Sequence, residues 1–313
     1  MSPQFALLTL FLVLTLAPCG RAQEIIPLYP EGVPCDNPGE TDEIVQREDI
    51  GAMVTHTRTP VLHHYAPVPR MATGGAIMII PGGGYVIEAW GHEGIDIANR
   101  LTYEGLHVFL LRHRLPRNEP LPCKTHVALD DARRGIQTIR LLADSLGIGQ
   151  DRVAVLGFSA GGHLTASASV HFIPGDSTTS IPASAFSSRP DASLPIYPVL
   201  IMDDTGAGHN GSRVSLLGEA EEQDPKLVGY YNLPERVHAD VPPTFLVHAS
   251  NDKGVVPENS LRYYSALVKH EVPASMHIFA TGGHGFGSGK DSAGPVQNWL
   301  DLAVEWLTWR GIL

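Results

Sequence analysis

The sequence predicts an α/β fold, in which a mostly parallel central sheet has helices on both faces. Continuous apolar runs of about five residues, typical of strands buried on both sides, recur along the chain. Amphipathic segments lie between these runs, so strands and helices alternate. The chain has 313 residues, is 43% apolar, and contains no internal repeat and no second apolar core. We therefore expect a single domain over residues 23–313.

Residues 1–22 have the pattern of a cleavable leader. The apolar run from Phe5 to Ala17 is too short to span a bilayer comfortably, and Gly20 and Ala22 form a small-x-small cleavage site. The usual positively charged start is missing, and the alternative is a buried or membrane-anchoring helix. We expect the leader to be removed and the mature protein to be secreted or periplasmic, without a membrane partner.

The first half of the domain contains well-defined elements. Residues 23–59 are rich in proline and charge, are hard to assign to an element, and are expected to wrap the sheet edge. A strand over 61–66 is ended by Pro67 and Pro69, the later strands are apolar runs, and the helices have apolar residues at three- and four-residue steps. The expected strands are Val61–Ala66, Ala76–Ile80, His107–Leu111 and Val153–Leu156, and the helices are Glu93–Glu104, Thr125–Leu146 and Ala160–Val170. Four interleaved charges predict a solvated face on the second helix: Asp130, Asp131, Arg133 and Arg134.

The second half alternates in the same way, with two irregular stretches. Residues 171–190 are rich in serine, proline and threonine and predict a loop. Residues 203–240 have weak helical character and predict an insertion that forms a lid or a pocket wall. The same apolar patterns predict the strands Ser193–Met202, Thr244–Ala249 and Met276–Ala280 and the helices Pro257–Lys269 and Val296–Trp309.

The stretch Gly157-Phe158-Ser159-Ala160-Gly161 predicts a nucleophile. It follows an apolar strand and begins a helix of small residues, which is the sharp strand-turn-helix connection that exposes a serine hydroxyl. The residues two before and two after the serine must lack side chains, or they would clash. The amides at the start of the helix stabilise negative charge at the same point. Ser159 is therefore the predicted nucleophile.

The serine needs a base, and the base needs a carboxylate that orients it. Among 15 histidines we select His284, which lies in a glycine-rich stretch after the last predicted strand. Asp252 follows the preceding strand, so the two loops meet at one sheet edge; Asp203 and Asp204 are the alternative acids. His163, on the helix after the serine, is expected to pack or to support the site. The chain order Ser, Asp, His is that of the α/β-hydrolase fold.

The run Gly82-Gly83-Gly84 predicts an oxyanion hole, because it follows the Ala76–Ile80 strand. We expect the donors to be the amides of Gly83 or Gly84 together with that of Ala160. Tyr85, which ends the run, is expected to contact the substrate. Phosphate and dinucleotide motifs are absent from the sequence, as is metal-ligand spacing, so no cofactor and no metal are expected.

Composition restricts the partners. The net charge of −11 disfavours nucleic acid and anionic lipid surfaces. Outside the leader, Cys35 and Cys123 remain, and whether they pair is left open by the sequence. Asn210-Gly-Ser212 is a glycosylation sequon in a eukaryotic host. The oligomeric state is also left open.

Taken together, the motifs resemble those of secreted α/β-hydrolases of the acetyl xylan esterase and feruloyl-esterase-like group, which is related to the hormone-sensitive lipase branch. The matching segments are Leu28–Gly32, Pro81–Tyr85, Gly157–His163, His209–Arg213, Leu216–Gly218, Pro242–Ala249, Asp252, Val256-Pro257 and Gly282–Gly287. The likeness covers roughly residues 25–310. In the lipase branch the oxyanion loop usually begins His-Gly-Gly-Gly, and Pro81 stands here in place of that histidine, which argues against a lipase. The resemblance implies hydrolysis of acetyl or feruloyl esters on plant cell-wall polysaccharide.

The sequence therefore predicts a secreted serine carboxyl esterase that acts on a small ester or an acylated polysaccharide such as xylan. Two alternatives remain. A serine peptidase of the prolyl-oligopeptidase type shares the fold and the three catalytic residue types, but that group usually carries a large N-terminal domain. A non-catalytic carbohydrate-binding protein could have kept the fold, although it would have no use for Ser159, Asp252 and His284 together.

Overall fold

The computed structural model describes residues 23–48, 51–117, 123–204, 206–219 and 223–313. The expected leader, residues 1–22, lies outside them, so its removal stays a prediction. None of the described helices is both long and apolar enough to cross a membrane.

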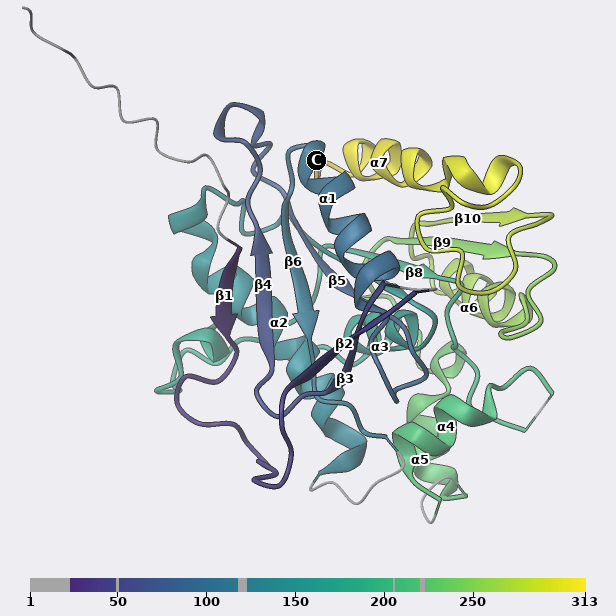
Figure 1. The fold of residues 1–313 in the computed structure, drawn as a ribbon, viewed down its shortest axis with the longest axis horizontal. Helices are drawn as coiled ribbons and strands as arrows, with labels where there is room; N and C mark the ends of the chain where they lie inside the picture. Colours follow the sequence, from purple (N-terminus) through teal and green to yellow (C-terminus); the bar gives the residue numbers. More distant parts are fainter. Residues whose placement is uncertain (1–22, 49–50, 118–122, 205, 220–222) are drawn as a thin grey trace, which may run out of the picture.

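The described strands form one large sheet and one small sheet (Figure 1). The large sheet has eight strands in the order β1-β4-β6-β5-β7-β8-β9-β10. Pairing is antiparallel between β1 and β4 and between β4 and β6, and parallel from β6 to β10. The bounds are β1 Glu24–Pro27, β4 Val61–Tyr65, β5 Ala76–Ile80, β6 His107–Arg112, β7 Val153–Phe158, β8 Ala192–Ile196, β9 Thr244–Ala249 and β10 Ala274–Phe279; the small sheet pairs β2 Glu43–Arg47 with β3 Gly51–His56. The expected mostly parallel sheet is confirmed.

Helices cover both faces of the large sheet, as expected, because successive residues of a buried strand point to opposite sides. Met78 and Ile80 of β5 pack in one apolar cluster with α2 and α3, whereas Ile77 and Ile79 pack in another with α1 and α7. The helices are α1 Asp96–Tyr103, α2 Lys124–Leu146, α3 Ser159–Val170, α4 Asn210–Leu217, α5 Pro225–Tyr231, α6 Glu258–Lys269 and α7 Trp299–Trp309; a π-helical turn, η2 Trp90–Ile95, precedes α1. Short 3-10 turns occur at Pro69–Met71, Pro182–Ala185, Leu233–Glu235 and Pro295–Asn298.

Two sequence-based expectations about elements are wrong. The expected strand over residues 193–202 ends instead at Ile196, because Tyr197 adopts a left-handed backbone conformation with φ +35° and the chain turns away from the sheet. The expected solvated face of α2 is also incorrect at Asp131, which is fully buried. Its carboxylate holds the Arg114 guanidinium at 2.7 and 3.0 Å and also accepts the Arg114 backbone N–H at 2.9 Å.

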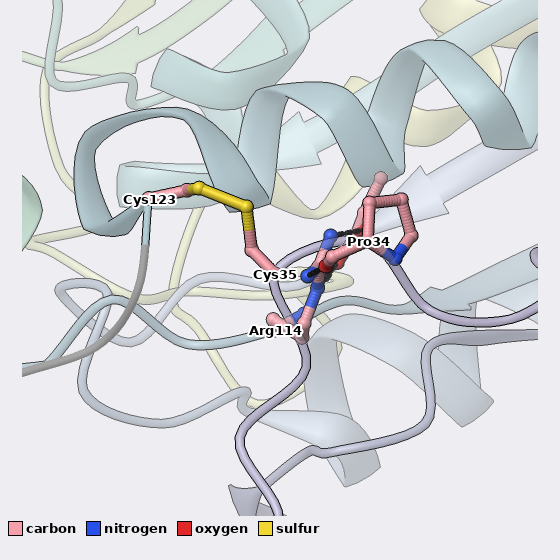
Figure 2. Close-up of a disulfide and its surroundings, with 5 residues drawn as sticks. Pro34, Cys35, Arg114 and Cys123 are labelled. Atoms are coloured by element: carbon pink, nitrogen blue, oxygen red, sulfur yellow. Dashed lines mark hydrogen bonds and ion pairs between the residues drawn. A yellow bond between two sulfur atoms is a disulfide. The ribbon is translucent and has the colours of Figure 1, made fainter.

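Cys35 and Cys123 form a disulfide, which answers the question that the sequence left open (Figure 2). Their Cα atoms lie 6.1 Å apart and the two residues are separated by 88 positions. Next to the bridge, the Arg114 guanidinium donates to the carbonyl oxygen of Pro34 (Figure 2). The N-terminal segment is therefore fixed to the start of α2 by a covalent bond and to the segment after β6 by a charged hydrogen bond.

Candidate active site

Ser159 lies between β7 and α3 with φ +50°, a left-handed conformation that strains a residue with a side chain. The turn is so tight that its neighbours leave no room for a Cβ atom. A Cβ on Gly157 would stand 2.3 Å from the carbonyl oxygen of Gly161, and one on Gly161 would stand 2.2 Å from that of Ile80. These contacts are the clash that the sequence pattern predicts for the two glycines.

Ser159, His284 and Asp252 form a hydrogen-bonded chain. Ser159 Oγ lies 2.9 Å from His284 Nε2, and His284 Nδ1 lies 2.7 Å from Asp252 Oδ2. Asp252 Oδ1 accepts the backbone N–H groups of Gly254 and Val255, both at 2.8 Å. The three residues follow β7, β10 and β9, so the carboxyl ends of parallel strands bring them together.

Asp252 is buried, and its environment keeps it ionised. Burial alone would raise its pKa, but hydrogen bonds from His248 and His284 and from the Val255 N–H outweigh burial and hold the pKa well below its usual value. A charged Asp252 fixes the proton of a neutral His284 on Nδ1, because a carboxylate can only accept there. Nε2 is then free to take the Ser159 proton.

The alternative acids bond elsewhere. The Asn232 side chain donates to Asp203 at 3.2 Å, and Arg213 pairs with Asp204. His163 is fully buried, where its ring bonds the Tyr85 hydroxyl and the Tyr231 carbonyl oxygen at 2.6 and 3.0 Å. His163 therefore helps to pack α3, the helix that begins at the serine, as its position in the sequence suggested.

The glycine loop that carries two of the predicted oxyanion donors lies next to the serine. A Cβ on Gly82 would stand 3.0 Å from Ser159 Cβ, so the glycine loop borders the nucleophile. Gly82 donates its N–H to Glu93 Oε2 at 2.7 Å and is not available to a substrate. Within the described part of the chain, the N–H groups of Gly83 and Gly84 have no acceptor, and Ala160 lies in the first turn of α3. Their role as oxyanion donors stays a prediction.

A buried pair missed by the sequence analysis connects the two glycine-rich loops. Glu93 Oε1 accepts the Tyr197 hydroxyl at 2.8 Å, and the same hydroxyl accepts the Gly287 N–H at 3.0 Å. Through Gly82 and Gly287, the pair links the oxyanion loop to the loop that carries His284. No sequence signal pointed to either residue, since Tyr197 lay inside the strand expected over 193–202 and only the three-dimensional contacts reveal Glu93.

Tyr85 was expected to contact the substrate, and the structure contradicts this. Its side chain is only 2% exposed and its hydroxyl bonds His163 at 2.6 Å. Its φ of +64° turns the side chain into the core as the glycine loop ends. The buried Tyr85 side chain therefore fixes the end of the glycine-rich loop to the core.

In the described ranges, no group of three or more His, Cys, Asp or Glu side chains could hold a metal ion.

Comparison with known proteins gives a family model and curated relatives that match much of this chain. The BD-FAE family model matches residues 62–267. The acetylxylan esterase of Xylanibacter ruminicola is 32% identical over 224 residues, which are 71% of this chain and 43% of that protein. Endo-1,4-beta-xylanase B of Butyrivibrio fibrisolvens is 31% identical over 210 residues, 67% of this chain and 32% of that protein. The chain thus spans less than half the length of these curated relatives.

Solved structures agree with the fold. The acetyl ester-xyloside bifunctional hydrolase of Caldicellulosiruptor lactoaceticus is 32% identical, with a TM-score of 0.76 over 93% of this chain and 97% of that one. An esterase of Thermogutta terrifontis has a TM-score of 0.65 over 88% and 96% of the two chains. At 23% identity, the second likeness concerns the fold alone.

Proposed function

This chain belongs to the BD-FAE family of α/β-hydrolases, and we propose that it is a secreted serine esterase that removes acetyl groups from xylan or a related polysaccharide. The observation that carries the proposal is the hydrogen-bonded chain from Ser159 Oγ through His284 to Asp252. The esterase names of the relatives favour ester hydrolysis over peptide hydrolysis, and the acetylxylan and acetyl ester-xyloside names favour an acetylated xylan substrate.

The geometry supports a two-step mechanism. Ser159 Oγ attacks the ester carbonyl carbon while His284 Nε2 takes the hydroxyl proton, and Asp252 stabilises the resulting imidazolium. The carbonyl oxygen, now negatively charged, is held by the amides of Gly83 or Gly84 and of Ala160. His284 then gives its proton to the alcohol oxygen, the C–O bond breaks, and an acetyl group remains on Ser159. Water, deprotonated by His284, releases acetate and restores the serine hydroxyl.

Export is proposed on two grounds. Residues 1–22 have a leader pattern, and a disulfide that joins distant positions is typical of proteins that fold in an oxidising compartment. N-terminal sequencing of the protein from the medium or periplasm tests this, with a start near Gln23 expected and an intact leader contradicting it.

The experiment for the activity is hydrolysis of p-nitrophenyl acetate, butyrate and octanoate by the wild type and Ser159→Ala. We expect preference for acetate and a loss of kcat of at least about a thousandfold in the variant. Ser265→Ala is the matched control, because this exposed hydroxyl bonds only a carbonyl of its own helix. Equal rates in wild type and Ser159→Ala would reject the nucleophile, and preference for octanoate would reject an acetyl substrate. Release of acetate from acetylated xylan then tests the polysaccharide.

A further inference from the structure

A polar cavity beside the proposed site takes no part in the steps above. It has a volume of about 150 Å³ and lies between the chain that follows β8 and the start of α4. Its side-chain lining includes Met202, Asp203, Asp204, His209, Asn210 and Arg213. All of these residues except Met202 belong to residues 203–240, the stretch that the sequence predicted as a lid or pocket wall.

The wall of this cavity is attached to both halves of the site. On one side, the Asn259 amide donates to the Ala207 carbonyl oxygen at 2.9 Å and to that of Val256 at 3.0 Å, so the wall adjoins the loop that carries Asp252. On the other side, Ser212 Oγ lies 4.0 Å from where a Cβ on Gly84 would stand. The start of α4 thus borders the oxyanion loop.

His209 presents a hydrogen-bond donor here. It caps α4, where its Nδ1 accepts the Ser212 N–H at 3.1 Å, so Nδ1 carries no proton. Burial, and next the charge of His284, lower the pKa of His209, which keeps the ring neutral at pH 7 with its proton on Nε2. In the part of the chain that the structure describes, this Nε2–H meets no acceptor.

The rest of the lining suits a neutral ligand that is rich in hydroxyl groups. Arg213 is held by Asp204, by the Asn210 side-chain oxygen at 3.1 Å and by the Met202 carbonyl oxygen at 3.2 Å. Its charge is therefore balanced within the wall, and Asp203, which accepts the Asn232 amide at 3.2 Å, also lines the cavity. Hydroxyl groups both donate and accept, so they match such a mixed lining, whereas an anion would meet two carboxylates.

We propose that this cavity is the subsite for the sugar ring whose ester is cleaved, and that His209 Nε2–H donates a hydrogen bond to that sugar. The inference rests on the proposed esterase function. His284 Nε2 must reach the leaving alcohol oxygen to protonate it, so the alcohol part of the ester lies on the His284 side. The cavity adjoins that side through the Asp252 loop.

The test compares two acetate esters that differ in their alcohol. Methyl O-acetyl-β-D-xylopyranoside offers a sugar to the cavity, and p-nitrophenyl acetate does not. In His209→Asn, the new amide oxygen replaces Nδ1 as the helix cap while the Nε2–H donor is lost. We expect the ratio of kcat/KM for the sugar ester over the aryl ester to fall about tenfold, the usual effect of one lost hydrogen bond.

His270→Asn is the matched control. His270 is an exposed residue at the end of α6 and is not among the residues that line the cavity. Its ratio should equal that of the wild type. A ratio in His209→Asn within twofold of wild type would overturn the subsite while leaving the esterase intact. Aryl ester hydrolysis that survives Ser159→Ala is a different result and would overturn both proposals.

A second measurement needs no variant. Methyl β-D-xylopyranoside, the alcohol product, should competitively inhibit hydrolysis of p-nitrophenyl acetate by the wild type. Methyl β-D-glucuronopyranoside should inhibit at least tenfold more weakly, because its carboxylate would face Asp203 and Asp204. Absence of inhibition by the neutral sugar, or equal inhibition by both sugars, would contradict the proposed lining.

Discussion

Single buried polar contacts determine how the reacting groups of this site are aligned. Neither Glu93 nor Tyr197 touches a reacting atom, yet each bonds a backbone amide of a loop that does. Burial, and then the adjacent Glu93 carboxylate, raise the pKa of Tyr197 well above its usual value, so its hydroxyl stays protonated and donates. The Tyr197 ring also lies edge-on to the His284 ring, with 5.2 Å between centroids.

Tyr197→Phe should therefore act on kcat. The change removes one hydrogen bond to a carboxylate and leaves the Gly287 N–H without its acceptor. The loop that carries His284 is then no longer held in position relative to the oxyanion loop. A hydrogen bond to a charged group contributes about 1.5–3 kcal/mol, which corresponds to a kcat roughly ten- to a hundredfold lower. Steady-state kinetics on p-nitrophenyl acetate should give an almost unchanged KM.

Tyr103→Phe is the control, since Tyr103 is 74% exposed and receives the same chemical change. A Tyr197→Phe enzyme with wild-type kcat would exclude the positioning role. The positioning role would also be excluded if the loss of activity in Tyr197→Phe equalled the fraction of unfolded protein measured by circular dichroism.

At the scale of elements, the Arg114–Asp131 pair joins the end of β6 to α2. Asp131→Asn keeps the shape but removes the charge opposite a buried guanidinium. Leaving one buried charge unpaired typically costs about 3–5 kcal/mol. Urea unfolding should report a loss of that size, and Asp130→Asn, one position earlier on a more exposed part of the same helix, should change stability by less than about 1 kcal/mol. Similar losses in both variants would refute the special role of Asp131.

The sequence predicts an element well where one physical signal dominates it. β5 and β9 have the expected bounds because each is a continuous apolar run buried on both faces. β1 and β2 were not predicted because they are short and mostly exposed, and β3 was not predicted because only two of its residues are buried and its sequence has no continuous apolar run. The expected strand over 193–202 was too long because its apolar residues continue past the point where the backbone turns.

The candidate site follows the same rule. Ser159, Asp252 and His284 were identified because each follows a strand whose carboxyl end meets the others at one sheet edge. Tyr85 was misplaced because a sequence cannot tell to which side a loop turns a side chain. Glu93 and His209 were not selected as site residues. Their roles depend on which atoms the Glu93 carboxylate and the His209 ring contact in the folded chain, and a sequence does not show these contacts.

At the scale of the whole molecule, buried histidines couple stability to pH. Burial is the main cause that lowers the pKa of four of them to about 4: His63, His107, His163 and His171. The folded state keeps them neutral, whereas the unfolded chain binds protons near the ordinary value of 6.5. Their contribution is therefore complete above pH 6.5 and is lost as the pH falls toward 4. Burial raises the pKa of three carboxyl groups, Glu88, Asp130 and Asp191, and these oppose the effect of the histidines.

We expect the free energy of unfolding to be roughly 2–4 kcal/mol lower at pH 5.5 than at pH 7.5. Urea titrations at constant ionic strength measure this directly. In His171→Gln, which cannot take up a proton, the difference between the two pH values should shrink. Stability that is equal or greater at pH 5.5 would contradict the assignment of neutral buried rings.

The disulfide should stabilise the molecule as a whole, because it closes a loop over a sequence separation of 88 residues in the unfolded chain. Chain-entropy estimates give about 4.6 kcal/mol for a loop of this length. The double change Cys35→Ser and Cys123→Ser should lower the urea unfolding free energy by that order, and the reduced wild type should match it. A loss below about 1 kcal/mol would show that the bridge does not restrict the unfolded chain.

The same bridge has a consequence for damage by proteases. A single cut anywhere between positions 36 and 122 would leave two fragments held by sulfur, so the nicked molecule would migrate as one band until it is reduced. The bridged loop contains Gly83 and Gly84, whereas Ser159, Asp252 and His284 lie outside it. A molecule cleaved there can thus keep the oxyanion loop and the Ser159, Asp252 and His284 side chains together, and how long it stays active among proteases would depend on the redox state of its surroundings.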